Sequence, residues 1–349
     1  MTTGMAKSSS PESSNGPVFV VGMWRSGTSL LYALLNLHPQ IALMYEGDLP
    51  LLSALFKGGK SKSDWVERWE FWNGALSRHH IDMALIPADV AGLPAAMELV
   101  YRKHAGLAMW GCKSPNYYDC MVPLAKQFPG ARFIVIYRNP TDVCRSIVRA
   151  GRKSRWFSKK GLPLRVILGY REMKREAEGL ARMGANVHEL QYEDLVREPA
   201  TALTGICRFL QIPYDARMVA LDEADRSAIY NADHHAGVKG KKIAAAAKRE
   251  EVLSPGLRAK IRRYANLWQA EYGGTWPAHP QPDTTQPDLP GWMERSLDRL
   301  RYRAFRGYDH AIAAFYCVAP LGLLRAYRRR RQPAEAQKTA DNFQSVGAD

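Results

Sequence analysis

The sequence predicts an α/β fold of three layers, in which helices cover both faces of a parallel β-sheet. Three short apolar runs, rich in β-branched residues, have the pattern of buried strands: residues 17–22, 132–138 and 187–192. Each run is followed by a stretch of helical character: residues 28–37, 141–150 and 199–210. Strands that alternate with helices indicate βαβ units and therefore a parallel sheet. With 349 residues, 46% of them hydrophobic, the chain is long enough to bury one sizeable core.

The element boundaries follow from local signals. Gly22 closes the first run before a tight loop, and the helix after the loop has leucines at helical spacing. Asn139-Pro140 closes the second run, and Thr141 or Asp142 is expected to begin the helix that follows. The third helix begins with a proline, which suits the first turn of a helix.

Two further intervals, residues 49–110 and 164–183, are expected to be mostly helical. Trp65, Trp69 and Trp72 stand at i, i+4 and i+7, which puts them on one helix face. Such a face can pack in the core or contact an acceptor molecule. Aromatic faces usually belong to a core, so packing is the favoured interpretation.

Composition shifts divide the chain into five segments. We expect a disordered polar N-terminal segment, one globular domain, a proline-rich linker, a basic amphipathic extension of interfacial type and a disordered tail, at residues 1–16, 17–276, 277–290, 291–331 and 332–349. No run of about 18 apolar residues occurs, which argues against a conventional membrane-spanning helix.

The formal net charge of +15 is concentrated in two regions. Residues 145–182 hold twelve Lys and Arg against three Glu, and residues 295–331 hold ten Arg and two Asp. The first region can steer an anionic ligand, and the second suits an anionic membrane surface. The remainder of the chain is nearly neutral, so we expect no nucleic-acid partner.

Cysteines and histidines indicate neither disulfides nor a metal site. The five cysteines form no Cys-x-x-Cys pair, which favours a reducing compartment. The histidine pairs at residues 79–80 and 234–235 lack metal-ligand spacing and are interpreted as structural. We therefore expect a cytoplasmic protein, with peripheral membrane association as an option.

The strongest local motif is GMWRSGTS at residues 22–29, which joins the first strand to the first helix with the spacing of a phosphate-binding loop. Its later backbone N–H groups are expected to converge on a phosphate, helped by the helix dipole: those of Ser26, Gly27, Thr28 and Ser29. The fold is therefore P-loop-like. A metal-dependent nucleotide hydrolase is disfavoured, because Thr28 stands at the Walker lysine position and Arg138 where such an enzyme needs an Asp.

Together with this loop, a second motif carries a family resemblance. Tyr137-Arg138-Asn139-Pro140 ends the second strand, and Ser146 follows Arg138 by eight residues. The combination resembles the sulfotransferases that use 3′-phosphoadenosine-5′-phosphosulfate (PAPS). The resemblance covers about residues 17–276 and implies the P-loop-like fold, PAPS as sulfuryl donor and no required metal.

By this resemblance, the residues of the first loop hold the 5′-phosphosulfate: Arg25, Ser26, Gly27, Thr28 and Ser29. Arg138 and Ser146 are implied to hold the 3′-phosphate, and a rigid charged fork plus a hydroxyl about two helical turns away suits that anion. A structural ion pair at a strand end is the alternative for Arg138.

Two further stretches extend the resemblance. Tyr192, in QYEDL, matches a tyrosine close to the donor nucleotide, with a core tyrosine as the alternative. Lys239 and Lys241, in AGVKGKK, match a loop over the 3′-phosphate, with a solvated basic turn as the alternative.

The catalytic groups are also implied by the resemblance. The branch that acts on small molecules uses a histidine after a Lys-x-Pro element, but residues 117–120 offer none. The protein-tyrosine and some carbohydrate branches use a glutamate after a His-Pro pair, and Glu46 stands in that position. Glu46 is therefore the expected general base, whereas Asp48 has the position of a helix N-cap. Lys113, in GCKSP, is the expected acid or electrostatic stabiliser, with Arg25 assisting, and an exposed loop lysine is its alternative.

The sequence thus predicts a PAPS-dependent sulfotransferase of the glutamate-base type. The acceptor is expected to be a hydroxyl or amine of a glycan, a lipid-linked molecule or a peptide. Two other functions stay open at this point: a P-loop kinase or nucleotide-binding protein, and a non-catalytic adaptor for membranes or polyanions.

Overall fold

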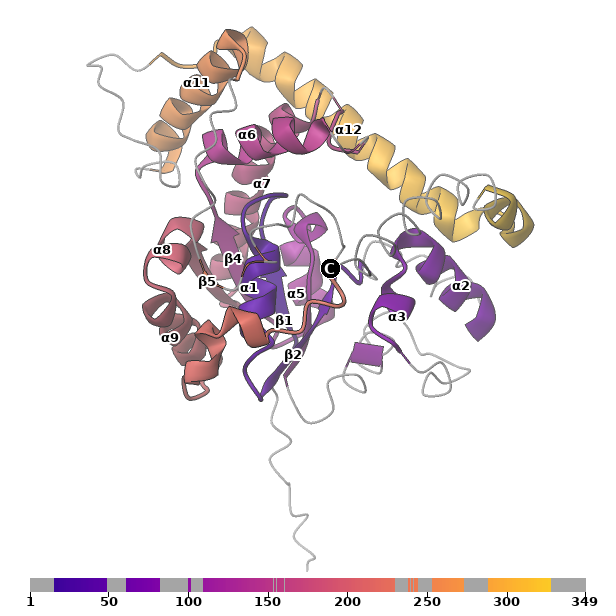
Figure 1. Cartoon of the computed structure of the whole chain (residues 1–349). Helices are drawn as coiled ribbons and strands as arrows, with labels where there is room; N and C mark the ends of the chain where they lie inside the picture. The colour runs from indigo at the N-terminus through magenta and orange to yellow at the C-terminus, as the bar shows by residue number, and fades with distance from the viewer. Residues whose placement is uncertain are drawn as a thin grey trace, which may run out of the picture.

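A computed structural model (Figure 1) describes residues 16–48, 61–81, 100–101, 109–152, 154, 156–159, 161–229, 238, 240, 242–243, 253–272 and 288–327. Five strands form one sheet: β1 (Val18–Val21), β2 (Ile41–Tyr45), β3 (Met109–Lys113), β4 (Arg132–Tyr137) and β5 (Asn186–Gln191). Their order is β2-β3-β1-β4-β5, and every neighbouring pair is parallel. The predicted parallel α/β fold is confirmed.

The described helices lie between and after the strands. Their bounds are α1 (Thr28–Leu35), α2 (Lys62–Asn73), α3 (Ala75–Arg78), α5 (Met121–Gln127), α6 (Pro140–Gly151), α7 (Leu162–Arg182), α8 (Tyr192–Arg197), α9 (Pro199–Leu210), α11 (Pro255–Tyr272) and α12 (Trp292–Val318). Short 3₁₀ turns occupy η3 (Pro115–Tyr117), η4 (Ala216–Val219) and η5 (Leu221–Glu223).

The sheet separates two apolar clusters, because alternate residues of a strand face opposite sides. Phe19 and Phe133 belong to the cluster that includes residues of α5, α6 and α7. Val18 and Ile134 belong to the cluster built with α1, α8 and α9. Burial on both faces explains why β1 and β4 have continuous apolar sequences.

Strands β2 and β3 were not predicted. Their sequences, IALMY and MWGCK, contain one β-branched residue between them, so they lack the local strand signal. Gly111 of β3 is needed for sheet packing, because a Cβ there would lie 1.9 Å from the Val18 carbonyl oxygen. The two strands form through tertiary pairing with each other and with β1.

The start of α6 also differs from the prediction. Asn139 is its N-cap, and the Asn139 side chain accepts hydrogen bonds from the Thr141 and Asp142 amides at 2.9 and 3.4 Å. Pro140 takes the first helical position, where a missing N–H costs nothing. The dipeptide that ends the strand therefore also begins the helix.

The basic extension is a single long helix, α12, followed by a short helix at Leu321–Tyr327. In Figure 1, α12 runs from the neighbourhood of α11 past α6 to α2. Within the described residues no single helix is long and apolar enough to cross a membrane; α12 and the short helix pass that test only as a pair bent by 119°. Nearly all of the predicted disordered ends and linker fall outside the described residues, as do residues 328–331 of the extension.

Candidate active site

The register of two parallel strands brings Glu46 and Lys113 together. Tyr45 of β2 is paired with Lys113 of β3, so the residue after Tyr45 lies at the same edge of the sheet. The Glu46 amide donates to the Lys113 carbonyl at 2.7 Å. Glu46 has a φ of 50°, which a non-glycine residue adopts only where its surroundings enforce it. Its carboxylate meets the Lys113 ammonium, with Oε1 2.7 Å from Nζ.

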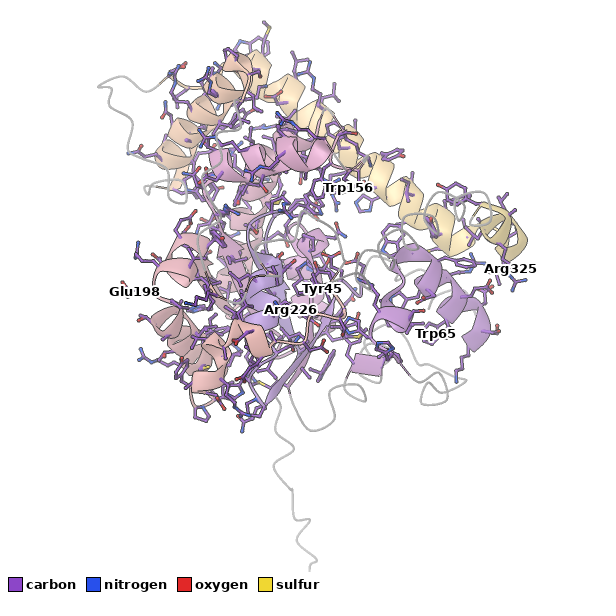
Figure 2. All side chains as sticks on the ribbon, viewed as in Figure 1. Tyr45, Trp65, Trp156, Glu198, Arg226 and Arg325 are labelled. Carbon is purple, nitrogen blue, oxygen red and sulfur yellow. The ribbon has the colours of Figure 1, made fainter. Side chains whose placement is uncertain are left out.

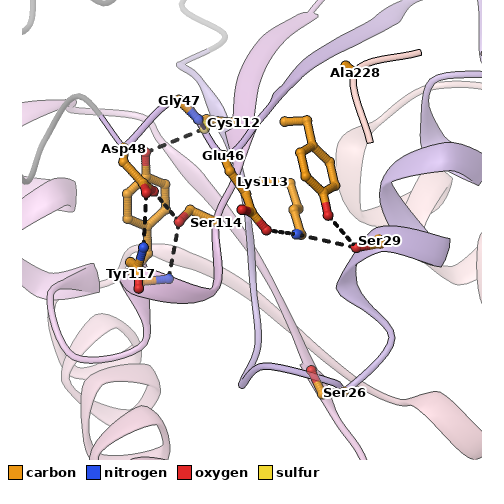
Figure 3. Close-up of polar contacts among 12 residues, drawn as sticks. Ser26, Ser29, Glu46, Gly47, Asp48, Cys112, Lys113, Ser114, Tyr117 and Ala228 are labelled. Carbon is orange, nitrogen blue, oxygen red and sulfur yellow. Dashed lines mark hydrogen bonds and ion pairs between the residues drawn. The ribbon is translucent and has the colours of Figure 1, made fainter. Parts of the chain in front are cut away.

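Lys113 is buried, with 1% of its side chain exposed, between the carboxylate and the first turn of α1 (Figure 3). Its ammonium also lies 3.5 Å from Ser29 Oγ and 4.0 Å from the centre of the Tyr45 ring. Ser29 and Tyr45 share a hydrogen bond of 2.8 Å. Burial lowers the pKa of Lys113, and Glu46 opposes that shift. The exposed-loop alternative for Lys113 is excluded by this burial.

The segment that carries Glu46 is fixed by buried contacts on its other side. Gly47 has no room for a side chain, since a Cβ would lie 1.9 Å from the Tyr101 hydroxyl. The Gly47 carbonyl accepts from the Trp69 indole at 2.5 Å, and the Trp72 indole donates to Asp48 at 3.4 Å. The tryptophan face of α2 therefore packs as expected, with Trp65 and Trp69 buried, and it also holds the Glu46 segment.

Asp48 contributes more than the N-cap role that its sequence position suggested. Its buried carboxylate accepts hydrogen bonds from the Ser114 hydroxyl and, at 2.9 Å, from the Asn116 amide. Burial, and then the charge of Glu46, raise the pKa of Asp48. Asp48 thereby ties the Glu46 segment to the loop that follows Lys113. The helix that it was expected to cap falls outside the described residues.

The predicted phosphate loop turns sharply from β1 into α1. Arg25 and Gly27 have φ of 70° and 98°, and Gly27 is the N-cap of α1. The Ser26 amide and hydroxyl both donate to the Met23 carbonyl, at 3.0 and 2.7 Å, so they close the turn. Contrary to the expectation from the sequence, the Ser26 amide is therefore engaged within the loop. The first N–H groups of any α-helix lack intrahelical acceptors, which leaves those at the start of α1 suited to an anion.

Arg25 lies with the residues of the second motif. Its Nε donates to Ser146 Oγ at 3.0 Å, and its carbonyl accepts from Arg138 Nη1 at 3.0 Å. Burial, followed by the charge of Arg138, lowers the pKa of Arg25 to about 10. Two guanidinium groups and a hydroxyl are thus linked by hydrogen bonds, and no carboxylate among the described residues pairs with Arg138, an arrangement that favours an anion.

Tyr192 joins the two parts of the donor region. It is the first residue of α8, its ring lies 4.2 Å below the Arg138 guanidinium, and a Cβ on Gly27 would approach that ring to 2.3 Å. The structure thus brings most of the predicted site residues to one edge of the sheet, where the carboxyl ends of parallel strands commonly bind ligands. Lys239 and Lys241 lie outside the described residues.

Sequence reasoning missed Tyr45 and the positioning role of Asp48. Both flank Glu46, and the unpredicted strand β2 is what places them. His79 is a buried structural histidine, as expected, because its Nε2 accepts from the Tyr45 amide at 2.8 Å. Among the described residues, no group of three or more His, Cys, Asp or Glu is placed to hold a metal ion.

Comparison with known proteins identifies the family. The sequence model of the sulfotransferase family matches residues 17–216, more than half of the chain. This chain belongs to the sulfotransferase family. The structure also has the fold of a solved sulfotransferase domain, that from the curacin biosynthetic pathway, with a TM-score of 0.53 at 18% identity. The superposition covers 73% of this chain and 97% of that domain.

The curated relatives are distant in sequence. A putative protein-tyrosine sulfotransferase of Caenorhabditis briggsae is 23% identical over 203 residues, which are 58% of this chain and 68% of the relative. Nodulation protein H of Rhizobium tropici is 25% identical over 214 residues, 56% of this chain and 76% of the relative. Family membership supports a transferase over the alternatives of a P-loop kinase or a non-catalytic adaptor.

Proposed function

We propose that this sulfotransferase moves the sulfuryl group of PAPS directly to a hydroxyl or amine of its acceptor, with Glu46 as general base. The observation that carries the proposal is the contact of 2.7 Å between Glu46 and the buried Lys113, beside the first turn of α1. A carboxylate and an ammonium at the mouth of an anion-binding loop are the two groups that such a transfer needs.

The proposed roles balance the charges and bonds of the reaction. Glu46 takes the proton of the acceptor as its oxygen or nitrogen forms a bond to sulfur. The bond between sulfur and the bridging phosphate oxygen breaks, and Lys113 offsets the charge on that oxygen. Adenosine 3′,5′-bisphosphate (PAP) leaves, and Arg25 adds positive charge from the loop. The reaction draws on no oxidant, reductant or metal.

The same ammonium explains how the base becomes available. In the free protein, Lys113 is the partner of Glu46. A phosphosulfate at the start of α1 offers Lys113 a second anion, which weakens its hold on the carboxylate. Binding of PAPS would thus free the Glu46 carboxylate to act on the acceptor. Until PAPS binds, the carboxylate stays paired with the Lys113 ammonium.

The donor is assigned to the two anion-binding regions. The loop residues Arg25, Gly27, Thr28 and Ser29 would hold the 5′-phosphosulfate. Ser26 would support them by closing the turn through its hydrogen bonds to Met23. Arg138 and Ser146 would hold the 3′-phosphate. Tyr192 would support Arg138 through its ring, as the distance of 4.2 Å indicates. Lys239 and Lys241 are proposed from the sequence motif alone.

For the acceptor, we propose a glycan, a lipid-linked molecule or a peptide. The absence of a histidine after the Lys-x-Pro element disfavours the small-molecule chemistry of that branch. The names of two relatives, both protein-tyrosine sulfotransferases of Caenorhabditis species, favour the peptide option within this set. Sulfur-labelled PAPS incubated with separated glycan, lipid and peptide fractions would identify the acceptor.

The test of the base assignment is Glu46→Gln, which keeps the shape of the side chain and removes its basicity. We expect kcat with the labelled acceptor fraction to fall by roughly 10²- to 10⁴-fold, the usual value of a positioned base. PAP affinity, measured by calorimetry, is expected to change little. The matched control is Glu189→Gln, which alters a second Lys–Glu pair, with Lys174 at 2.9 Å.

Two outcomes would refute the assignment. A Glu46→Gln enzyme that keeps kcat within a few-fold of the wild type has another base. A variant that loses PAP binding together with activity shows that Glu46 serves the donor site instead.

A further inference from the structure

One side of the long helix α12 is held to the rest of the protein by polar contacts. All three of its acidic residues form ion pairs with cations of other helices: Glu294 with Arg263 at 2.7 Å, Asp298 with Lys260 at 2.5 Å, and Asp309 with Arg165 at 2.6 Å. Two further contacts fix the same side. The Tyr302 hydroxyl donates to that of Tyr118 at 3.1 Å, and Arg306 pairs with Asp119. The three acidic side chains of α12 are thus all paired with cations inside the protein.

The opposite side of α12 is apolar and exposed. Large apolar residues recur there in steps of three, four, seven or eight, which places them on one helix face: Met293, Leu297, Leu300, Tyr308, Phe315 and Val318. Their exposure is unusual for side chains of this size, reaching 65% at Leu300 and 72% at Val318. We call these six residues the apolar face. The short helix after α12, which is bent from it by 119°, also exposes Leu323 and Tyr327.

The far end of the apolar face is also anchored. Arg325 pairs with Glu67 of α2 at 2.7 Å, and Figure 2 shows Arg325 close to α2. Arg68 of α2 donates to the Tyr316 and Ala319 carbonyls at 2.9 and 2.7 Å. The apolar face is therefore held on a rigid support along its whole length.

Arginines flank the apolar face on both sides. At 100° per residue, Arg301 and Arg303 lie on the two flanks of the apolar face, whereas Arg299 lies close to the angle of Arg306 on the inner side. Arg301 and Arg303 are exposed, and Arg301 Nη1 also lies 3.6 Å from Asp298 Oδ1. The outward half of α12 therefore combines apolar side chains with positive charge only, since its acids are paired on the inner side.

We propose that the apolar face docks on an anionic lipid bilayer, with α12 lying in the plane of the headgroups. The chemistry of the surface is that of an interfacial helix: an apolar stripe that enters the acyl boundary, aromatic residues along it and flanking arginines that meet lipid phosphates. The exposed apolar residues extend from Met293 to Val318, so several side chains would contact the bilayer together.

Charge complementarity favours lipid over a second copy of the chain. If two copies paired through this face, Arg301 and Arg303 of each would meet a surface with the same charge. The three acids of α12 could not relieve the repulsion without leaving their internal partners. A bilayer rich in phosphatidylserine presents the opposite charge and gains from every arginine.

The test is co-sedimentation of the full-length protein with vesicles of phosphatidylcholine alone and with about one third phosphatidylserine. We expect binding to the anionic vesicles that weakens with added salt and is much poorer on neutral vesicles. Leu297→Ser with Leu300→Ser should weaken binding by about tenfold or more, since each leucine loses its burial in the acyl boundary. Arg301→Gln with Arg303→Gln should weaken it by roughly five-fold per arginine.

Matched controls come from the end of α7. Met183, 48% exposed, is replaced by Ser, and the exposed Arg182 by Gln. Both should leave vesicle binding unchanged. None of these residues has been placed in the donor or catalytic site, so PAP binding serves as a check that each variant is folded.

Three results would overturn the proposal. Equal binding of wild type and both double variants to anionic vesicles would show that another surface binds lipid. A dimeric mass in solution that becomes monomeric in Leu297→Ser with Leu300→Ser, without vesicle binding, would assign the face to a second copy. A marked fall in melting temperature of that variant, again without vesicle binding, would show that another segment of the chain covers the face.

Discussion

The pairing of Arg25 and Arg138 makes a quantitative prediction about the 3′-phosphate of the donor. The pKa of Arg25 is lowered to about 10, so holding its charge in the free protein costs roughly 3 kcal/mol relative to its ordinary value, at 1.36 kcal/mol per pKa unit. A 3′-phosphate held by Arg138 and Ser146 would lie beside Arg25, whose Nε donates to Ser146 Oγ, and its negative charge would offset part of that cost. We therefore expect the 3′-phosphate to account for a large part of nucleotide affinity.

The perturbation is Arg138→Met, tested against two ligands. PAP carries the 3′-phosphate, whereas adenosine 5′-monophosphate lacks it. A hydrogen bond to a charged group contributes about 1.5–3 kcal/mol, so the variant should bind PAP roughly 10- to 150-fold more weakly. Its affinity for the monophosphate should change little. The difference between the two ligands isolates the contact with the 3′-phosphate, as in a double-mutant cycle.

The stability of the free variant should change little, because two effects oppose each other. Arg138→Met removes the hydrogen bond of 3.0 Å to the Arg25 carbonyl and also relieves the repulsion of Arg25. Calorimetry gives the affinities, and thermal unfolding without ligand gives the stability. Arg197→Met, at a side chain 67% exposed on α8, is the control. An equal loss of affinity for both ligands, or no loss for PAP, would refute this reasoning.

Two further predictions concern the loop glycine and the buried lysine. Gly27→Ala should lower the free energy of unfolding by more than the about 1–2 kcal/mol expected for an alanine at positive φ, because its Cβ would lie 2.3 Å from the Tyr192 ring. Gly184→Ala, at a φ of 69° with open space around it, measures the backbone strain alone. Equal losses for the two variants in urea unfolding would contradict the contact with Tyr192. Burial lowers the pKa of Lys113, so between the lowered pKa and the ordinary lysine pKa the unfolded chain binds more protons than the folded protein. The free energy of unfolding of the wild type should therefore rise with pH relative to that of Lys113→Met, by at most about 1.4 kcal/mol per pH unit. A flat or falling difference between about pH 8 and pH 10 would show that Lys113 keeps an ordinary pKa.

The sequence determined the framework because its signals are local. Strands β1 and β4 are buried on both faces, and their sequences are therefore continuous apolar runs. The tight turn before α1 requires glycine at Gly22 and Gly27. The motifs at residues 22–29 and around Arg138 indicated the sulfotransferase family, which the comparisons confirmed. The tryptophan spacing of α2 likewise predicted packing, and both Trp65 and Trp69 are buried.

Only the tertiary structure decided how these parts meet. Glu46 and Lys113 are 67 residues apart, and their contact depends on the register of β2 with β3, two strands whose sequences carry little strand signal. The positive φ of Glu46 and the buried links of Asp48 exist because the surrounding side chains enforce them. The same holds for α12. Its composition predicted an amphipathic helix, but the ion pairs with α7 and α11 determine which side of the helix contacts the rest of the protein. Long-range pairing and burial depend on residues far apart in the chain, so no local pattern can encode them.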